Sequence, residues 1–215
     1  NLLKSLPSSV QHISFSSSMV VYGVPKDAKV TEKTKISPTK SYAFAKIATE
    51  HYLQYFSRVN NLPVAILRYS SVYGPNHMSK RLIPNVIQNL LNCKKITLTG
   101  EGKAVRDYIF VDDVCHITIK IMLEGYNGIL NIGSGSGTDI KTICLKLLHI
   151  TKKSKSLLEF NKEKKEGYSL YYDIGKLNSV LNSPYKFTSI EDGLIKTVKW
   201  HKKLIGENKN ENFTK

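Results

Sequence analysis

Hydrophobic positions in the first third of the chain follow strand and helix patterns in turn. Residues 12–18 (HISFSSS) predict a short strand that ends in small polar residues. After a polar loop, apolar residues recur at three- and four-residue spacing from Ser41 to about Arg58, which predicts a helix. The recurring positions are Tyr42, Ala45, Ala48, Tyr52, Tyr55 and Phe56. Leu62–Tyr69 (LPVAILRY) is a nearly continuous apolar run, typical of a strand buried on both faces of a parallel sheet. Strand, helix and strand alternate, which favours an α/β layered fold.

The remainder of the chain predicts shorter elements of both kinds. In order, the pattern predicts a helix over about Leu82–Leu91, strands over ITLTG and DYIFV, a helix to about Glu124, a strand over GILNIG, a helix to about Leu148, and helices over about Ile174–Leu181 and Ile190–Leu204. Asp112 and Asp139 can each cap the helix that follows by accepting a backbone hydrogen bond. The stretch from Lys152 to Gly167 is basic, and we expect it to be exposed.

Composition narrows the class of protein. Of the 215 residues, 41% are hydrophobic and 23% are charged, which is ordinary globular usage and enough for one sizeable core. Every apolar run is far shorter than the roughly 18 residues of a membrane span, and NLLKSLPSSV has no signal-peptide core, so no membrane partner is expected. Cys93, Cys115 and Cys144 include no C-x-x-C pair, so we expect no metal site and no disulfide framework. Each lies in an apolar stretch as a small hydrophobe, and a cytoplasmic setting is the simplest for free cysteines.

The net charge of +15 raises the question of a nucleic-acid partner. Only four of the 32 basic residues are arginine, the side chain that reads bases and grips phosphate in a two-pronged contact. The lysines are scattered, which indicates a solvated basic surface. We therefore expect no nucleic-acid partner, whereas a smaller anionic substrate is compatible with this charge.

The pair Tyr42 and Lys46 (YAFAK) is the strongest local signal for chemistry. Four residues apart on a helix, the two side chains share one face, and an ammonium near a phenol favours the phenolate, a base usable near neutral pH. Alone, the pair also fits a surface lysine lying over a tyrosine ring. Ser16, Ser17 and Ser18 end a buried strand, and the carboxyl ends of parallel strands face the ligand crevice. A hydroxyl there can orient a sugar or alcohol oxygen, or can simply satisfy local backbone groups.

In their order along the chain, these segments resemble the extended short-chain dehydrogenase/reductase family, in particular its NAD-dependent nucleotide-sugar epimerases and dehydratases. The matching segments are SSSMVVYG, SYAFAK, LRYSSVYGP, GEGKAVRDYIFVDDV, ILNIGSGSG, KKEGYSLYYDIGKLNSVL and EDGLIKTVKW, between about Ile13 and Trp200. The resemblance implies a partial Rossmann-type, doubly wound parallel sheet from residues 1–75, with returning segments later in the chain. A smaller α/β substrate-binding portion would come mainly from residues 76–205, and residues 206–215 would form a flexible tail.

The resemblance also implies roles for single residues. Ser18, five residues before the glycine of V-Y-G, would be the catalytic hydroxyl and contact the substrate. Tyr42 would be the general base that takes a proton from a sugar hydroxyl. Lys46 would favour the Tyr42 phenolate and, with Tyr42, bind the nicotinamide ribose. Arg106 would contact the diphosphate of the substrate, the alternative being an ion pair with a neighbouring carboxylate. Lys165 stands where the family commonly has a second diphosphate-binding arginine, so we expect that contact to be weaker or lost.

The sequence departs from the family pattern at several positions. Met19 and Val20 stand where the 4,6-dehydratases of the family carry an Asp-Glu acid/base pair. Neither side chain can transfer a proton, which argues against a 4,6-dehydratase. Ser71 stands where many members have a substrate-contacting asparagine, and we expect Ser71 to contact the substrate. Tyr168 replaces an acidic residue, which leaves the identity of the sugar nucleotide open.

Members of the family begin with a strand and a G-x-x-G-x-x-G turn that hold the cofactor pyrophosphate, and this sequence contains neither. Gly133–Gly137 (GSGSG) does not replace that turn, because the segment comes late in the chain and its spacing differs. We therefore expect this chain to be the C-terminal portion of a longer protein and to be inactive alone.

The activity implied for the complete protein is NAD-dependent epimerisation of a nucleotide-linked sugar, at C4, through a transient keto intermediate. NADP is an open alternative as cofactor, and the complete protein is expected to be a homodimer. A reductase, a decarboxylase or a dehydratase on the same scaffold is the alternative among enzymes. A degenerate chain that binds a partner or a sugar nucleotide without chemistry is the alternative from another class.

Overall fold

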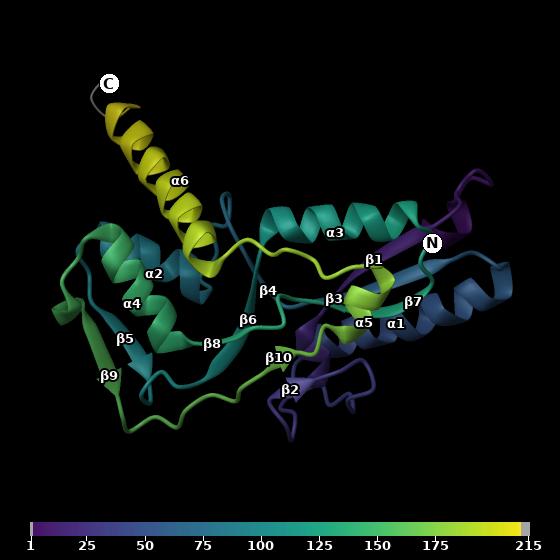
Figure 1. Ribbon diagram of the computed structural model, residues 1–215, viewed down its shortest axis with the longest axis horizontal. Helices are drawn as coiled ribbons and strands as arrows, with labels where there is room; N and C mark the ends of the chain where they lie inside the picture. Colours follow the sequence, from purple (N-terminus) through teal and green to yellow (C-terminus); the bar gives the residue numbers. More distant parts are fainter. Residues whose placement is uncertain (1, 212–215) are drawn as a thin grey trace.

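The elements form two groups that lie side by side, and the first group is built around a central parallel sheet (Figure 1). The computed structural model describes the backbone of residues 2–211 and the side chains of residues 2–206. The first group contains the strands β1 (Ile13–Ser18), β3 (Val64–Tyr69) and β7 (Gly128–Ile132) with the helices α1 (Ser41–Asn60), α3 (Val111–Leu123) and α5 (Gly175–Val180). The second group contains the helices α2 (Leu82–Leu91), α4 (Ile140–Thr151) and α6 (Ile190–Glu211) with the strands β5 (Ile96–Thr99) and β9 (Leu158–Asn161).

Short strands connect the two groups. They are β4 (Ser71–Tyr73), β6 (Val105–Phe110) and β8 (Gly137–Asp139), and the pair β2 (Lys29–Val30) and β10 (Tyr171–Tyr172). β6 pairs in parallel with β4 and antiparallel with β8, whereas β2 pairs in parallel with β10. Three 3-10 turns complete the described elements: η1 (Leu2–Ser5), η2 (Met19–Tyr22) and η3 (Lys155–Leu157).

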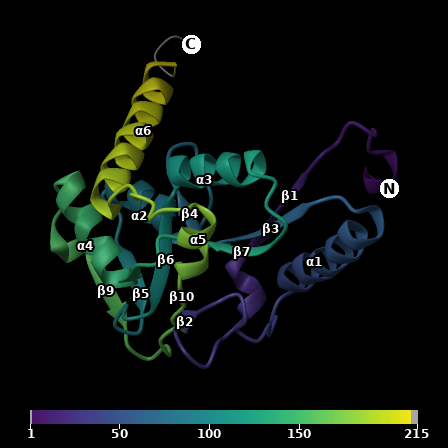
Figure 2. The ribbon, with the colours of Figure 1, turned by 45° about the vertical axis from the view of Figure 1, so that its right-hand side comes forward.

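The central sheet has the order β1-β3-β7, with all three strands parallel. Figures 1 and 2 show α1 on one side of this sheet and α3 on the other. Ile66 of β3 packs against Leu53 of α1, whereas the next residue, Leu67, belongs to the cluster that includes Ile117 of α3. Because neighbouring residues of a strand point to opposite faces, β3 is buried on both sides. The prediction from its apolar run is confirmed, and so is the doubly wound α/β class.

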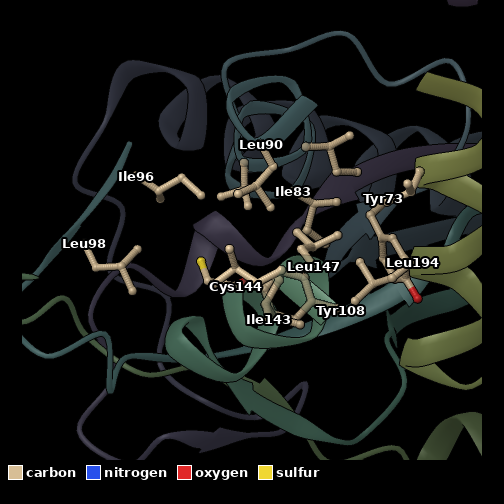
Figure 3. Close-up of a cluster of buried hydrophobic side chains, with 14 of the residues drawn as sticks. Tyr73, Ile83, Leu90, Ile96, Leu98, Tyr108, Ile143, Cys144, Leu147 and Leu194 are labelled. Atoms are coloured by element: carbon tan, nitrogen blue, oxygen red, sulfur yellow. The ribbon is translucent and has the colours of Figure 1, made fainter. Parts of the chain in front are cut away.

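The second group has its own hydrophobic core. Figure 3 shows side chains of α2, α4 and α6 packed together over β5 and β6, including Leu90, Leu147, Leu194 and Tyr108. α2 begins and ends where its apolar spacing predicts, because its apolar face is buried in this cluster. Tyr73 of β4 and Phe110 of β6 also belong to this core, whereas Ile109 of β6 belongs to the cluster of the first group.

The apolar stripe predicted for α1 faces outward. Tyr42, Tyr52 and Tyr55 are each at least half exposed, at 52%, 50% and 54%. The buried side of α1 carries Ala43, Glu50, Leu53 and Ser57. This side is the less apolar one, and it can be buried because its polar groups are bonded: the Ser57 hydroxyl donates to the Leu62 carbonyl at 2.7 Å, and Glu50 pairs with Arg68.

The caps predicted for two helices differ in outcome. Asp139 caps α4 and accepts a hydrogen bond from the backbone N–H of Thr142 at 2.8 Å, as predicted. Asp112 does not cap α3, whose N-cap position is Phe110. The neighbouring Asp113 is instead buried and accepts hydrogen bonds from Tyr185 and Thr188, so this turn is held by a distant segment.

The basic stretch from Lys152 to Gly167 has no buried residue, as expected, although it contains β9, which pairs with β5. Three other expectations need correction. The loop before α1 contains β2, which pairs with β10. The last helix continues to Glu211, so the first six residues of the expected tail are helical, while residues 212–215 lie outside the described residues. Cys144 is buried as expected, but Cys93 and Cys115 are exposed.

No helix among the described residues is long and apolar enough to cross a membrane.

Candidate functional site

The carboxyl end of β1 carries Ser18, the predicted catalytic hydroxyl. Ser18 is the last residue of β1 and the N-cap of η2, with an extended backbone (φ −151°, ψ 151°). Its hydroxyl accepts a long hydrogen bond of 3.5 Å from the backbone N–H of Val20. The serine therefore stands at the carboxyl end of a parallel strand, where ligands of α/β sheets bind. Contrary to the expectation of a buried strand, β1 is only partly buried, because it lies at one end of the strand order.

α1 brings Tyr42 and Lys46 to the same end of β1. The Lys46 ammonium donates a hydrogen bond of 2.7 Å to the backbone carbonyl of Ser16 and lies 5.5 Å from the centre of the Tyr42 ring. The pair is thus adjacent on one face of the helix, as predicted, and Lys46 binds two residues before Ser18. Within residues 2–206 no hydrogen bond joins Ser18 to Tyr42, so the convergence of all three groups stays a prediction.

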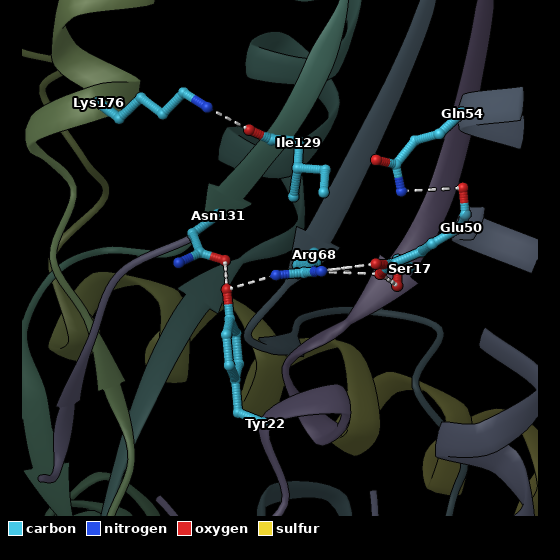
Figure 4. A network of polar contacts seen from close by, with 8 residues as sticks. All are labelled: Ser17, Tyr22, Glu50, Gln54, Arg68, Ile129, Asn131 and Lys176. Carbon is cyan, nitrogen blue, oxygen red and sulfur yellow. Dashed lines mark hydrogen bonds and ion pairs between the residues drawn. The ribbon is translucent and has the colours of Figure 1, made fainter. Parts of the chain in front are cut away.

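A buried polar network lies directly behind this end of the sheet (Figure 4). It consists of Ser17, Tyr22, Glu50, Arg68 and Asn131, each at most 3% exposed. The Arg68 guanidinium donates to both Glu50 carboxylate oxygens, with Nη2 to Oε2 at 2.6 Å and Nε to Oε1 at 3.1 Å. The Ser17 hydroxyl donates to Glu50 Oε1. We call these five residues the buried network.

Tyr22 completes the buried network on the other side of Arg68. Its hydroxyl accepts from Arg68 Nη1 at 2.9 Å and donates to Asn131 Oδ1 at 2.7 Å. Burial raises the pKa of the Tyr22 phenol, although Arg68 opposes the shift, so Tyr22 stays a neutral donor. Burial lowers the pKa of Arg68, but the bonds to Glu50 and the contact with Tyr22 outweigh it and raise that pKa above its ordinary value.

Sequence reasoning missed the buried network. The available signals were an arginine inside the apolar run LPVAILRY and a glutamate one turn after Lys46 on a predicted helix. Their pairing depends on how α1 lies on β3, which no local pattern contains.

A cavity of about 210 Å³ lies where β4, β6 and the beginning of α2 meet. Ser71, Arg106, His77 and Arg81 are among its lining side chains. The structure thus brings two predicted substrate-contacting residues, Ser71 and Arg106, to one cavity with a second arginine. Such a cavity can bind an anion by charge-assisted hydrogen bonds.

The Arg106 guanidinium is held by protein groups on one side. Its Nη1 donates to the carbonyls of Val105 and Tyr168, and the guanidinium lies 4.4 Å from the centre of the Tyr168 ring. These partners are carbonyls and a ring, not the carboxylate of the alternative interpretation. Tyr168, noted as a departure from the family pattern, therefore positions Arg106.

The positions of Lys165 and Ser71 give less direct support for contacts with a substrate. Lys165 is exposed, and it is not among the residues that line the Arg106 cavity, so its diphosphate contact stays a prediction. Its neighbour Glu166 accepts hydrogen bonds from the backbone N–H groups of Glu101 and Ala104, which ties the segment to the glycine turn before β6. The Ser71 hydroxyl donates to the thioether of Met19 at 3.6 Å.

Asp107, next to Arg106, is a second buried group that the sequence reasoning missed. Its carboxylate accepts hydrogen bonds from Ser134, Gly135 and Tyr172, which joins β6 to the GSGSG loop and to β10. Burial raises the pKa of this carboxyl, and the hydrogen bonds oppose the shift. Among the described residues, no three His, Cys, Asp or Glu side chains gather in a geometry that could hold a metal ion.

This chain is similar to known NAD-dependent epimerases and dehydratases. The family model described as "NAD dependent epimerase/dehydratase family" matches residues 1–133. The chain is 31% identical over 180 residues to dTDP-glucose 4,6-dehydratase 1 of Escherichia coli, which covers 80% of this chain and 50% of that protein. It spans between 28% and 61% of the length of the first curated relatives that it matches.

Solved structures of both enzyme types are similar to this chain. The UDP-glucose 4-epimerase of Thermotoga maritima with UDP-glucose superimposes with a TM-score of 0.82 at 30% identity, over 92% of this chain and 65% of that one. The dTDP-glucose 4,6-dehydratase of Bacillus anthracis in complex with NAD superimposes with a TM-score of 0.80 at 27% identity, over 88% of this chain and 61% of that one.

Proposed function

The chain belongs to the NAD-dependent epimerase/dehydratase family, and on this premise we propose that the full-length protein epimerises a nucleotide-linked sugar at C4. The observation that carries the proposal is the placement of Tyr42 and Lys46 beside the end of β1. Lys46 lies next to Tyr42 and donates a hydrogen bond to the carbonyl of Ser16, two residues before Ser18.

The residues at this end of β1 fit the nicotinamide ribose of NAD. The phenol of Tyr42 is half exposed, and the Lys46 ammonium lies beside it, so both can bond ribose hydroxyls. NAD, when bound, would accept a hydride from the sugar carbon and return it to the opposite face. NADP as cofactor is part of the same proposal until tested.

The chain's own residues would supply the proton chemistry and the positioning. Tyr42, with the Lys46 ammonium beside it, takes the proton of the sugar hydroxyl; general base catalysis of this kind contributes about 10²–10⁴ in rate. Ser18 donates its hydroxyl hydrogen to the reacting sugar oxygen and orients it. Arg106 holds the diphosphate at the cavity, with Ser71 on the same wall, and so fixes the sugar relative to Tyr42.

A 4,6-dehydratase is the second candidate, because proteins of that name are similar to this chain. Such a reaction needs an additional acid and base beside Ser18. The next residues are Met19, buried with its thioether bonded to Ser71, and Val20, and neither can move a proton. This local chemistry favours the epimerase.

The outer face of α1 supports a homodimer. Phe44, Tyr52, Tyr55 and Val59 are all at least half exposed and lie on one side of the helix. Large apolar side chains gathered in this way mark an interaction surface. We expect the full-length protein to pair through this face, which light scattering of wild type and Tyr55→Glu would test.

The function is tested by incubating the full-length protein and NAD with UDP-glucose or dTDP-glucose and following the sugar by proton NMR. Inversion at C4 without net formation of NADH supports the epimerase. A 4-keto-6-deoxy product supports the dehydratase, and stoichiometric consumption of added NADH supports a reductase. No conversion of either sugar nucleotide would contradict the proposal.

A further inference from the structure

The buried network crosses the whole central sheet in one row. Ser17 of β1 stands opposite Arg68 of β3, and Arg68 stands opposite Asn131 of β7. Each of the three is the next-to-last residue of its strand. The row therefore lies one residue below the carboxyl edge of the sheet, directly under the site proposed for chemistry.

Apolar side chains in place of this polar row would stabilise the fold at least as well. A buried ion pair loses so much hydration that hydrophobic residues of similar volume often stabilise as much or more. The same sheet face is apolar one step earlier in each strand, where Phe15, Ile66 and Ile129 pack with Leu53 of α1. The change from apolar to polar comes only beside Ser18, so stability alone does not account for it.

The ion pair holds Ser18 from both sides along the chain. Ser17, immediately before Ser18, donates to Glu50, and Tyr22, four residues after it, binds Arg68. A buried hydrogen bond to a charged partner is stronger and more directional than a neutral one. The end of β1 and the turn η2, which meet at Ser18, are thus both fixed to the Glu50–Arg68 pair.

The same pair also fixes the helix that carries the base. Glu50 lies one turn after Lys46 and two turns after Tyr42 on α1. Together with the bond from Lys46 to the Ser16 carbonyl, the bond between Glu50 and Ser17 attaches α1 to β1 at two successive residues. Rotation or sliding of α1 along β1 would break both.

We propose that the Glu50–Arg68 pair is the positioning element of the active site, setting the Tyr42–Lys46 pair in register with Ser18. This inference rests on the proposed function. Ser17 and Tyr22 are positioning residues, because they act on the reacting groups only through this pair. The reaction class fits such a device, since a misplacement of about 1 Å can lower a rate about a hundredfold.

The test uses Ser17→Ala and Tyr22→Phe in the full-length protein. Each removes one hydroxyl from the buried network and leaves the ion pair intact. Ser14→Ala is the matched control, because Ser14 lies on the same strand and its buried hydroxyl has no hydrogen-bond partner among the described residues. We measure kcat, KM for the sugar nucleotide and thermal unfolding for each variant.

We expect Ser17→Ala and Tyr22→Phe each to lower kcat about tenfold or more. KM should stay within about twofold, because the substrate diphosphate binds at the Arg106 cavity. Ser14→Ala should change none of these.

Two results would overturn the inference while the proposed function stands. One is a wild-type kcat in both network variants. The other is a lower unfolding temperature with unchanged kcat in the folded temperature range, which would leave the network a purely structural role. A wild-type protein without turnover would instead remove the proposed function and this inference with it.

Discussion

Asp107→Asn should destabilise the protein measurably although it changes only one heavy atom. The carboxylate is fully buried and faces donors alone. Its Oδ1 accepts from the backbone N–H and the hydroxyl of Ser134, both at 2.8 Å, and its Oδ2 accepts from the backbone N–H groups of Gly135 at 3.1 Å and Tyr172 at 3.2 Å. An asparagine offers one acceptor oxygen, and its NH₂ group must face the other pair of donors.

The magnitude follows from the donors left without an acceptor. If the NH₂ group faces Gly135 and Tyr172, two backbone N–H groups lose their acceptor. If it faces Ser134, only one does, because the hydroxyls of Ser134 and Ser70 can turn and accept from the amide. Each buried unsatisfied donor costs about 1–3 kcal/mol, so the cheaper orientation gives an expected loss of about 1–3 kcal/mol. The lower half of this range is favoured, because the amide avoids the burial of charge that raises the pKa of Asp107. For a domain of this size, the melting temperature should fall by about 2–8 °C.

Urea unfolding of the full-length protein at pH 7, followed by circular dichroism, measures this loss. Asp112→Asn is the matched control, because Asp112 is exposed in the first turn of α3 and should change stability by less than about 1 kcal/mol. If Asp107→Asn unfolds within about 0.5 kcal/mol of wild type, the hydrogen bonds of Asp107 do not hold the GSGSG loop, and the reasoning is refuted.

Two further predictions concern pH and affinity. Burial lowers the pKa of His201, and the charge of His77 adds to this shift. Below about pH 6.5 the unfolded chain therefore binds more protons at this position than the folded chain does. The free energy of unfolding is then unaffected by His201 above about pH 6.5 and decreases as the pH falls below it. The urea midpoint of unfolding should depend less on pH between pH 5 and 7.5 in His201→Phe than in wild type, whereas His51→Phe should keep the wild-type dependence. The same pH dependence in wild type and both variants would contradict the shift. Arg106→Ala should weaken sugar-nucleotide binding about 10- to 100-fold in calorimetric titration of the full-length protein. Lys165→Ala should weaken it less than about threefold, and an unchanged affinity in Arg106→Ala would leave Arg106 a structural residue.

The sequence was informative where an element's own pattern decides its structure. α2 has the predicted bounds because its apolar face alone specifies its burial. β3 was predicted as buried on both faces because its apolar run has no polar side. The family motifs likewise located Tyr42 and Lys46 on one helix face, since their spacing is a local property.

Prediction failed where a distant partner decides. Either of two faces of α1 could pack on the sheet. The more apolar face is exposed, because the other face bears Glu50, which pairs with Arg68 of β3. β2 and β9 are strands of two and four residues that exist through pairing with β10 and β5. Asp113 binds residues more than 70 positions away, which no helix-start pattern encodes.

The most direct test of the proposed function is the Tyr42→Phe variant of the full-length protein. Proton NMR of the sugar under saturating substrate and NAD should show kcat lowered by about 10²–10⁴, because the phenylalanine ring keeps the packing and removes only the base. Tyr52→Phe, a half-exposed tyrosine of the same helix, should retain wild-type turnover. A Tyr42→Phe variant that keeps more than about a tenth of the wild-type kcat would contradict the assignment of Tyr42 as the base.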